Sequence, residues 1–316
     1  MNKIRFYFTL SAIAITLFSC NKKDDDSSVA VPPRDRAEQY ATDIDSIEGY
    51  LKTHYITKVE VDGFTDVVIT KIDTATPPGT LSIWDNTEFP LQSKIVKNDS
   101  RVSNFTDGRV DDQVDYKLYY LVLNEGSKDR PVTVDSTYTS YRGWTLDNKD
   151  FDKSNVPLWS SFPENQFVSG YRQFLPHLKS ASSAITNDDG TVTFNGSGIG
   201  VVFIPSGLGY YNSSSAAIKA YSPLVFLIRL HSVKTRDHDR DGVMTIFEDL
   251  NGDHDFYNDD TDGDLIPDFL DVDDDGDRYY TKDEVKDPDG KIYPFALIPN
   301  CPGGTVKRHL DKTCHQ

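Results

Sequence analysis

Short runs of β-branched and aromatic residues, separated by turns, occupy the middle of the chain. They are DYKLYYLVL (115–123), VTVDSTYTSY (132–141), TVTF (191–194), IGVVFI (199–204) and LVFLIRLHSV (224–233). Runs of this length and composition are typical of strands. Between them, NQFVSGYRQFLPHL (165–178) has room for one short helix. We therefore predict one antiparallel sheet with a helix packed against it, an α+β domain over residues 113–235.

The segment before this domain has a different pattern. Residues 34–56 read RDRAEQYATDIDSIEGYLKTHYI, which predicts a helix. The apolar positions with helical spacing are Ala37, Tyr40, Ile44, Ile47 and Leu51. Residues 62–112 contain short β-rich runs broken by Pro, Gly and Asn. We expect a helical and β-stranded N-terminal extension over residues 35–112, and its pattern indicates no role.

The first twenty residues have the pattern of an export signal. Lys3 and Arg5 precede an apolar run that is too short to span a bilayer. The run ends in LFSC (17–20), which resembles the bacterial lipobox. We expect a lipoprotein signal peptide over residues 1–19 and lipidation of Cys20. The alternative is an ordinary secretory signal with an incidental cysteine.

Residues 20–34 are polar, contain proline and are expected to form a tether. Within them, NKKDDDSS (21–28) resembles the acidic export signal of Bacteroidetes surface lipoproteins. The two resemblances together imply an outer-membrane lipoprotein of the cell envelope. It would be anchored to the membrane through Cys20 and be either periplasmic or surface-exposed.

The negative charge of the chain is confined to one segment. The 316 residues carry a net charge of −17. Residues 237–289 contain 21 Asp and Glu against 4 Lys and Arg, whereas the rest of the chain has 29 of each kind. Nucleic acid is therefore not an expected partner, because phosphates are bound by basic patches. A dense acidic segment favours bound cations instead.

The acidic segment opens with DHDRDGVMTIFEDLNGDHD from Asp237. The positions that match the EF-hand calcium loop are Asp237, Asp239, Asp241, Gly242, Thr245 and Glu248. The Val243 carbonyl would supply a further ligand, and Glu248 would close the site with both oxygens. The preceding residues read as a strand, so the entering helix of an EF-hand is missing. That absence favours a structural calcium site over a sensor.

The next stretch, DDTDGDLIPDFLDVDDDGD (259–277), resembles a thrombospondin type 3 repeat. Its expected calcium ligands are Asp260, Asp262, Asp264, Asp268, Asp271, Asp273, Asp275 and Asp277. The loop expected to open at Asp271 has Lys282 where a closing Glu belongs, and Asp283 or Glu284 could substitute. Ile266 and Phe269 are too few to form a core. We therefore expect residues 236–290 to be a loop-rich module that is ordered only when calcium is bound.

Residues 291–316 form a C-terminal tail with two cysteines, Cys301 and Cys314. Two thiols alone do not make a metal site. Outside the cytoplasm, a disulfide between them is the expected pairing.

Four segments of residues 113–235 resemble motifs of the FKBP-type peptidyl-prolyl isomerases. They are YRGWTLDNKDFDKS (141–154), QFVSGY (166–171), FIPSGLGYY (203–211) and IKAYSPLVFLIRL (218–230). The first segment has Tyr-x-Gly and Phe-Asp-x-Ser in register without gaps. The resemblance covers less than half of the chain. It implies an antiparallel FKBP-like sheet wrapped on one short helix.

The resemblance also implies an aromatic pocket that speeds rotation about X-Pro bonds without covalent chemistry or a catalytic cofactor. Its residues would be Tyr141, Phe151, Asp152, Phe167, Val168, Tyr171, Tyr210, Ile218 and Phe226. Phe151 and Phe226 would be walls and Tyr171 the floor. The Val168 N–H and the Tyr210 hydroxyl would hold substrate carbonyls. Asp152 would be a buried carboxylate that accepts a hydrogen bond from Tyr141.

Three positions depart from the family pattern. Tyr171 stands where Trp is usual, Phe167 where a small aliphatic residue is usual, and Leu208 where Tyr is common. Two functions therefore stay open. The first is a monomeric isomerase that acts on proline-containing polypeptides and assists the folding of exported proteins. The second is a non-catalytic FKBP-like binding or adhesion lipoprotein with structural calcium repeats.

Overall fold

The computed structural model describes residues 32–61, 63–99, 112–162 and 167–314. The chain divides into two compact units, Met1–Pro33 and Arg34–Gln316, and all elements named below belong to the second. The expected signal peptide and Cys20 lie outside the described residues. Among the helices that are described, none is both long and apolar enough to cross a membrane.

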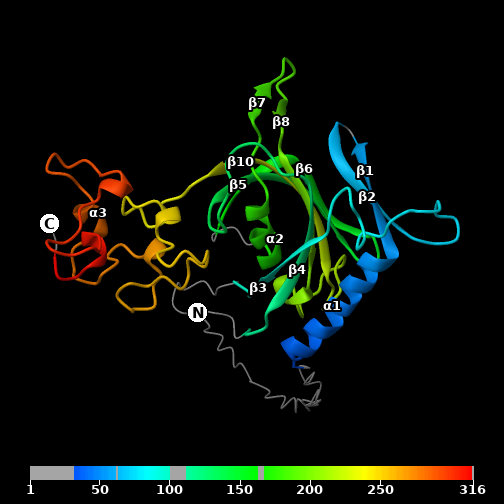
Figure 1. The fold of residues 1–316 in the computed structure, drawn as a ribbon, viewed down its shortest axis with the longest axis horizontal. Coiled ribbons are helices and arrows are strands. Elements are labelled where there is room, and N and C mark those ends of the chain that lie inside the picture. Colours follow the sequence, from blue (N-terminus) through cyan, green and yellow to red (C-terminus); the bar gives the residue numbers. More distant parts are fainter. Residues whose placement is uncertain (1–31, 62, 100–111, 163–166, 315–316) are drawn as a thin grey trace, which may run out of the picture. The chain divides into compact units, whose positions relative to one another are not determined.

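A six-stranded antiparallel sheet forms the centre of the fold, in the order β3-β4-β9-β10-β5-β6 (Figure 1). Its strands are β3 (Gln92–Val96), β4 (Tyr116–Asn124), β5 (Ser136–Thr145), β6 (Asp150–Ser161), β9 (Gly198–Ile204) and β10 (Leu224–Lys234). The apolar runs in the sequence predicted β4, β5, β9 and β10. An antiparallel sheet with few helices agrees with the predicted α+β class.

Alternate residues of the central strands enter two different cores. Phe226 of β10 and Ile204 of β9 belong to one core. Their chain neighbours Val225 and Phe203 belong to the other. Successive side chains of a strand point to opposite faces, so the sheet is buried on both faces. We call the Phe226 side the front face and the Val225 side the back face.

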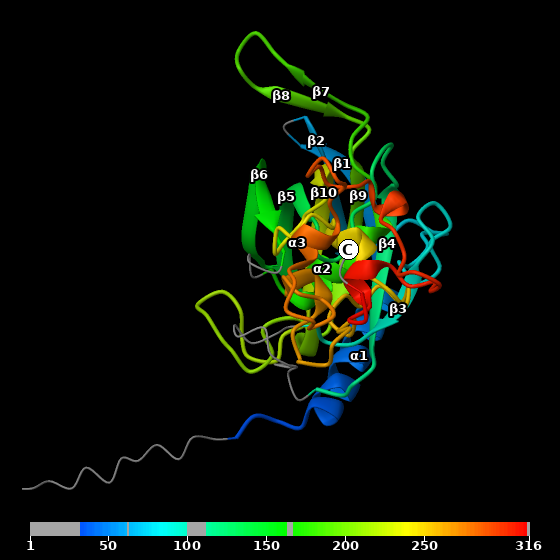
Figure 2. The same ribbon diagram turned by 90° about the vertical axis from the view of Figure 1, so that its left-hand side faces the viewer.

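The short helix α2 (Ser169–Phe174) covers the front face (Figure 2). Its Tyr171 side chain is fully buried and belongs to the same core as Phe226. The helix lies close to β9 because Gly170 has no side chain. A Cβ at Gly170 would lie 2.5 Å from Cγ2 of Ile204. The helix predicted within residues 165–178 is therefore present, and the front core lies between it and the sheet.

The N-terminal extension covers the back face. It consists of helix α1 (Arg36–Thr53) and a hairpin of β1 (His54–Val61) and β2 (Phe64–Lys71). Ile47 and Leu51 of α1 are fully buried in the same core as Val225. The extension also contributes β3 to the sheet. The described residues of the extension, 35–61 and 63–99, are thus part of the sheet's packing, a role that their pattern did not indicate.

Helix α1 ends three residues earlier than the predicted range of 34–56. His54 is already extended and pairs with Lys71 of β2. The β-branched residues that follow, within HYITKVEV, favour the strand. At the other end the helix is capped by Asp35, whose carboxylate accepts a hydrogen bond from the Glu38 N–H at 3.0 Å.

The TVTF run does not join the main sheet, contrary to the prediction. It forms β8 (Val192–Asn195), which pairs only with β7 (Ser183–Thr186). Figure 1 shows this hairpin as a ribbon that projects from the sheet. Its side chains are mostly exposed, since the sheet positions beside β9 are already taken by β4 and β10.

The acidic segment packs against the sheet domain through a small apolar cluster. Phe256 and Phe269 are buried together with Val134, which belongs to the connection between β4 and β5. His238 Nε2 also lies 2.6 Å from the carbonyl oxygen of Phe162, just after β6. Phe269 is therefore buried by a residue of the sheet domain, because the acidic segment itself supplies few apolar side chains.

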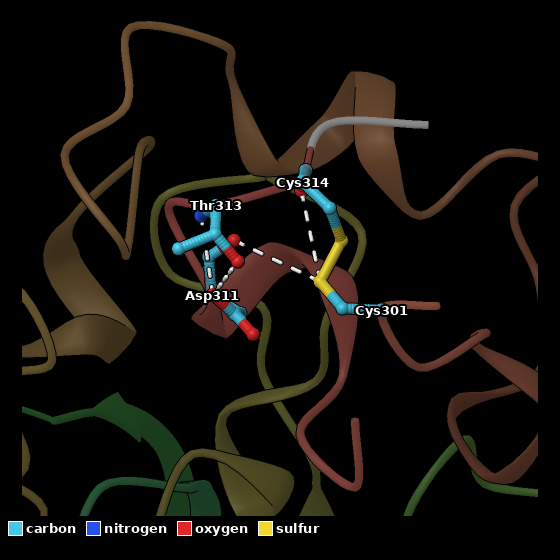
Figure 3. The surroundings of a disulfide bond; sticks show 4 residues. All are labelled: Cys301, Asp311, Thr313 and Cys314. Atoms are coloured by element: carbon cyan, nitrogen blue, oxygen red, sulfur yellow. Dashed lines mark hydrogen bonds between the residues drawn. A yellow bond between two sulfur atoms is a disulfide. The ribbon is translucent and has the colours of Figure 1, made fainter. Parts of the chain in front are cut away.

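The C-terminal tail folds together with the acidic segment. Ile298 of the tail is buried against Val243 and Val285, which belong to that segment. Cys301 and Cys314 are joined by a disulfide that lies beside Asp311 and Thr313 (Figure 3). Residues 236–314 thus form one continuous set of loops with the four-residue helix α3 (Thr281–Glu284).

One polar residue on the buried side of α1 joins the extension to the front of the molecule. Asp43 is 1% exposed. Its carboxylate accepts hydrogen bonds from Gln39 Nε2 at 2.6 Å and from the Ser206 N–H at 2.7 Å. Ser206 begins the loop that carries Tyr210. Asp43 therefore fixes the start of that loop to α1.

We expect Asp43→Ala to lower the free energy of unfolding by about 1–3 kcal/mol, because the buried Ser206 N–H loses its acceptor. Asp43→Asn retains an acceptor oxygen and should cost less. Urea unfolding of both variants checks this, with Asp45→Ala on the exposed side of α1 as the control. Equal stability of the Asp43→Ala and Asp45→Ala proteins would contradict the assigned contact.

Candidate functional site

The predicted pocket residues converge on the front face. The Phe226 ring centroid lies 5.3 Å from that of Tyr171, 5.4 Å from that of Phe151 and 6.1 Å from that of Tyr141. The Tyr171 and Phe151 rings stand nearly perpendicular to Phe226, which is a favourable aromatic geometry. The rings come from β5, β6, β10 and α2. The sequence motifs therefore identified side chains that the fold places together.

Strand register explains why the motif has a glycine at its third position. Gly143 of β5 pairs with Phe226 of β10 on one side and with Asp152 of β6 on the other. A Cβ at Gly143 would lie 2.6 Å from the Phe151 ring and 2.9 Å from the Phe226 ring. The absent side chain thus gives the two expected walls their space.

The expected floor is a buried tyrosine. The Tyr171 hydroxyl donates a hydrogen bond to Thr139 Oγ1 at 3.0 Å, so its burial leaves no unpaired donor. Phe167 stacks on the Tyr171 ring with a centroid distance of 4.5 Å. One face of the floor is therefore occupied by the side chain that departs from the family pattern.

A tyrosine–carboxylate pair lies at the edge of the aromatic cluster. The Tyr141 hydroxyl donates to Asp152 Oδ2 at 2.7 Å. Tyr210 is 45% exposed, and partial burial followed by the charge of Asp152 raises the pKa of its phenol. Tyr210 therefore lies within electrostatic reach of Asp152, and the Tyr141–Asp152 hydrogen bond is the one that the resemblance implied.

Asp152 itself is exposed, and the prediction of a buried carboxylate was wrong. The reason is that β6 is the edge strand of the sheet, with β5 as its one neighbour in it. The carboxylate is held by the Tyr141 hydroxyl instead of by burial.

The remaining pocket positions lie in the front core. Val168 caps α2, and its carbonyl accepts the N–H of Tyr171 at 3.0 Å. Ile218 is buried in the same cluster as Phe226. Leu208 is fully buried there too. The position where a tyrosine is common in the family is therefore filled by a core side chain.

Four acidic loops share one hydrogen-bond pattern. They open at Asp237, Asp249, Asp260 and Asp273. In each loop, the backbone N–H of position 6 donates to the side chain of position 1, that of position 5 to position 3, and that of position 7 to position 5. All twelve hydrogen bonds measure between 2.7 and 3.2 Å. The loop at Asp249 was not predicted, although its Asp-x-Asn-x-Asp spacing is visible in the sequence.

Position 6 of each loop has a left-handed backbone. It is Gly242, His254, Leu265 and Arg278 in turn, with φ from 68° to 97°. Three of these residues carry a side chain, for which this conformation costs about 1–2 kcal/mol. In the loops that open at Asp260 and Asp273, oxygens of positions 1, 3 and 5 lie within 4.8 Å of one another, which is the requirement for shared cation coordination.

The first loop supplies a buried carboxylate cluster. One ligand oxygen each from Asp239, Asp241, Glu248 and Asp274 lies within 4.8 Å of the others. Calcium–oxygen distances of about 2.4 Å allow ligands up to about 5 Å apart across one ion. Both carboxylate oxygens of Glu248 and of Asp274 are buried without a hydrogen-bond partner among the described residues. These orphaned anions fit a hard divalent cation.

The pKa values of the buried carboxylates also indicate that a cation is needed at this cluster. Burial, followed by the charges of Asp239 and Asp241, raises the pKa of Glu248 to about 10. Burial, followed by the charges of Asp241 and Glu248, raises the pKa of Asp274 to about 11. Deprotonated carboxylates at neutral pH thus need a compensating positive charge in this place.

Of the other expected ligands of the first loop, Asp237 and Thr245 make hydrogen bonds within the loop. Asp237 accepts the Gly242 N–H at 3.2 Å, and its second oxygen is buried without a described partner. The Thr245 hydroxyl bonds to His238 Nδ1 at 2.8 Å. The Val243 side chain is buried in the cluster with Ile298.

The last loop has a register two residues later than predicted. Its pattern opens at Asp273, which places Glu284 at the closing position 12. Oxygens of Asp273, Asp275 and Asp277 lie within 4.8 Å of one another. Burial, followed by the charges of Asp275 and Asp277, raises the pKa of Glu284 to about 8. Glu284 therefore stands at the closing position of this register, and Lys282 stands at position 10.

Asp271 consequently does not open a loop. It accepts the Asp273 N–H at 3.0 Å. Oxygens of Asp260, Asp262 and Asp264 form a third group within 4.8 Å, and it is mostly exposed. Asp268 accepts the N–H and the hydroxyl of Thr261, both at 2.8 Å.

Comparisons with known proteins cover parts of the chain. Residues 238–308 match the family model described as BamM C-terminal. No curated protein matches the chain. The matched segment runs from the first acidic loop past residue 290, in agreement with a tail that folds with the loops.

Two solved structures are similar to the chain over a limited part. A peptidyl-prolyl cis-trans isomerase of Pseudomonas syringae pv. tomato shares 23% identity over 37% of this chain and 75% of that chain, with a TM-score of 0.30. FkpA of Escherichia coli shares 27% identity over 37% of this chain and 48% of that chain, also with a TM-score of 0.30. The match thus spans about half the length of FkpA.

We expect Gly143→Ala to displace the Phe151 and Phe226 rings, because the new Cβ overlaps both. Overpacking of this kind costs about 1–3 kcal/mol of unfolding free energy. Chemical unfolding measures the loss, and Gly49→Ala is the control, since a Cβ there meets nothing within 4 Å. A Gly143→Ala protein as stable as the Gly49→Ala protein would contradict the described packing.

We expect calcium removal to destabilise the acidic module, because its buried carboxylates then repel one another. Calcium at about 100 times its dissociation constant would add about 2.7 kcal/mol to the stability of the form that binds it. Thermal unfolding in saturating calcium and in chelator measures this, with magnesium as a control of equal charge. Identical midpoints in calcium and chelator would contradict a cation role.

Proposed function

We propose that this protein is a peptidyl-prolyl cis-trans isomerase of the cell envelope that assists the folding of exported polypeptides. The observation that carries the proposal is the convergence of Phe151, Tyr171 and Phe226 beside the hydrogen-bonded pair Tyr141–Asp152. The sequence motifs support the same activity through their resemblance to the FKBP-type isomerases.

The proposed chemistry requires no nucleophile and no proton transfer. Rotation about an X-Pro bond faces a barrier of about 20 kcal/mol, because the planar amide is stabilised by resonance. A dry aromatic pocket that fits the twisted amide better than either planar form lowers this barrier. Phe151 and Phe226 would contact the proline ring, with Tyr171 beneath it.

Polar groups at the pocket edge would hold the substrate backbone. The Tyr210 hydroxyl and the Val168 N–H would donate to substrate carbonyl oxygens. Asp152 would fix the Tyr141 hydroxyl and place a negative charge beside the twisted amide. Because Asp152 is exposed in the free protein, a bound polypeptide would itself complete its burial.

We further propose that the C-terminal module binds calcium in a structural role. The orphaned carboxylates of Glu248 and Glu284, each at most 3% exposed, support this. They would close the loops that open at Asp237 and Asp273. Hard oxygen ligands in such numbers favour Ca²⁺ over softer metals.

The location is proposed from the leader sequence. Lipidation at Cys20 would anchor the mature chain to the membrane of the cell envelope. The likeness of residues 238–308 to the model described as BamM C-terminal supports a separate module at this end of the chain. The isomerase pocket would then lie between the tether and this module in the sequence.

A second function is a binding protein without useful turnover. The stacking of Phe167 on Tyr171 favours it, because the floor is both smaller than a tryptophan and partly covered. Such a pocket could hold a proline-containing segment without stabilising the twisted amide.

Isomerisation of a short X-Pro peptide by residues 21–316 separates these functions. We expect the wild-type rate to exceed the uncatalysed rate. Asp152→Ala should lower kcat/KM by at least about tenfold, equal to about 1.4 kcal/mol of transition-state stabilisation. Asp150→Asn is the matched control, because Asp150 lies on the same strand but pairs with Arg142.

Each other outcome decides against the enzyme. No acceleration by folded wild-type protein that still binds the peptide would favour the second function. No acceleration and no peptide binding would contradict both.

A further inference from the structure

Asp274 belongs to one acidic loop by sequence and to another by position. It lies between Asp273 and Asp275, which are positions 1 and 3 of the last loop. Its carboxylate instead lies within 4.8 Å of the ligand oxygens of Asp239, Asp241 and Glu248 in the first loop. Asp274 lies in a turn that is closed by the Gly276 N–H, which donates to the Asp273 carbonyl at 3.0 Å. Oxygens of Asp273 and Asp275 lie in the last loop's own group, whereas that of Asp274 lies in the first.

The burial of the Asp274 carboxylate indicates that it needs a cation beside it. The residue is 2% exposed, and both its carboxylate oxygens lack a hydrogen-bond partner among the described residues. The groups whose oxygens lie around its carboxylate are Asp239, Asp241 and Glu248, which are also acidic. A buried anion surrounded by anions is strongly unfavourable unless a cation is present.

The backbone of Asp274 is held by the last loop itself. Its N–H donates to the Thr281 hydroxyl at 3.2 Å. Thr281 is fully buried at position 9 of that loop, three residues before Glu284. Its own N–H donates to the Val272 carbonyl at 3.0 Å. The place of the Asp274 carboxylate therefore depends on the last loop being closed.

We propose that Asp274 is a ligand of the first-loop calcium ion and that calcium in the last loop increases the affinity of the first. Closure of the last loop by its own ion, through Glu284, orders the backbone on either side of Asp274. This supplies the first site with a carboxylate from outside its own loop, and added ligand charge increases calcium affinity. By linkage, the first ion increases the affinity of the last loop by the same factor. The inference rests on the proposed calcium binding and is independent of the pocket.

A site-resolved calcium titration of the whole mature chain by NMR tests this. The amide resonance of Gly242 reports on the first loop and that of Gly276 on the last. We expect Asp274→Asn to weaken calcium binding at Gly242 by about tenfold, a typical size for a coupling between sites. Asp289→Asn is the control, because that residue is exposed in the same segment. Equal effects of the two substitutions would overturn the proposal.

Glu284→Gln tests the coupling from the other side. It removes the closing ligand of the last loop and should weaken calcium binding at Gly242, although Glu284 is not in the first cluster. In a protein that already carries Asp274→Asn, adding Glu284→Gln should then cause no further loss of the calcium affinity reported by Gly242. An unchanged Gly242 affinity in the Glu284→Gln protein would overturn the coupling, even if Asp274→Asn did not fold. If neither glycine of the wild-type protein responded to calcium, the proposed calcium binding would fail as a whole.

Discussion

The burial of the sheet on both faces is the constraint on which the rest of the structure depends. Strands β9 and β10 place alternate side chains into two cores, so neither face can remain in water without exposing a row of large apolar residues. Helix α2 covers the front face, and α1 with its hairpin covers the back. The aromatic pocket belongs to the front core, where Gly143 and Gly170 leave space for rings and helix.

The extension on the back face also contacts the front of the molecule. Asp43 of α1 bonds to the backbone at Ser206, at the start of the loop with Tyr210. The pocket is therefore fixed from both sides of the sheet. A change in the packing of α1 is expected to reach Tyr210 through this hydrogen bond more directly than through the sheet.

A different constraint governs the C-terminal module. Its apolar clusters are small, and one of them includes Val134 of the sheet domain. Carboxylates are the most numerous buried side chains of the module. Buried carboxylates oppose folding unless a cation is bound. His238 lies at the join, with one ring nitrogen near Thr245 and the other near the Phe162 carbonyl. Since Phe162 lies against Phe167 at a ring distance of 6.2 Å, the module meets the sheet domain close to the pocket.

Sequence patterns predicted the parts that depend on local or motif-level information. The apolar runs located the central strands, and the Tyr-x-Gly motif located the pair Tyr141–Asp152. The exposure of Asp152 could not be predicted, because it follows from the edge position of β6. Two further features could not be predicted, the pairing of TVTF outside the main sheet and the addition of β3 to its edge. Both depend on which strands compete for each sheet edge. The place of Asp274 in the first carboxylate cluster was not predicted, because the other members of that cluster lie 26 residues or more away along the chain.

Hydrogen exchange of the calcium-loaded and the chelated protein tests the central claim most directly. The account holds that the sheet and its pocket are stabilised by two apolar cores, whereas the acidic loops are stabilised by cations. It predicts that amides of residues 237–284 lose protection in chelator while those of β9 and β10 keep theirs. Loss of protection in β9 and β10 together with the loops would show that the sheet also depends on the cation. Unchanged protection in the loops would show that they do not. Either result would contradict the account.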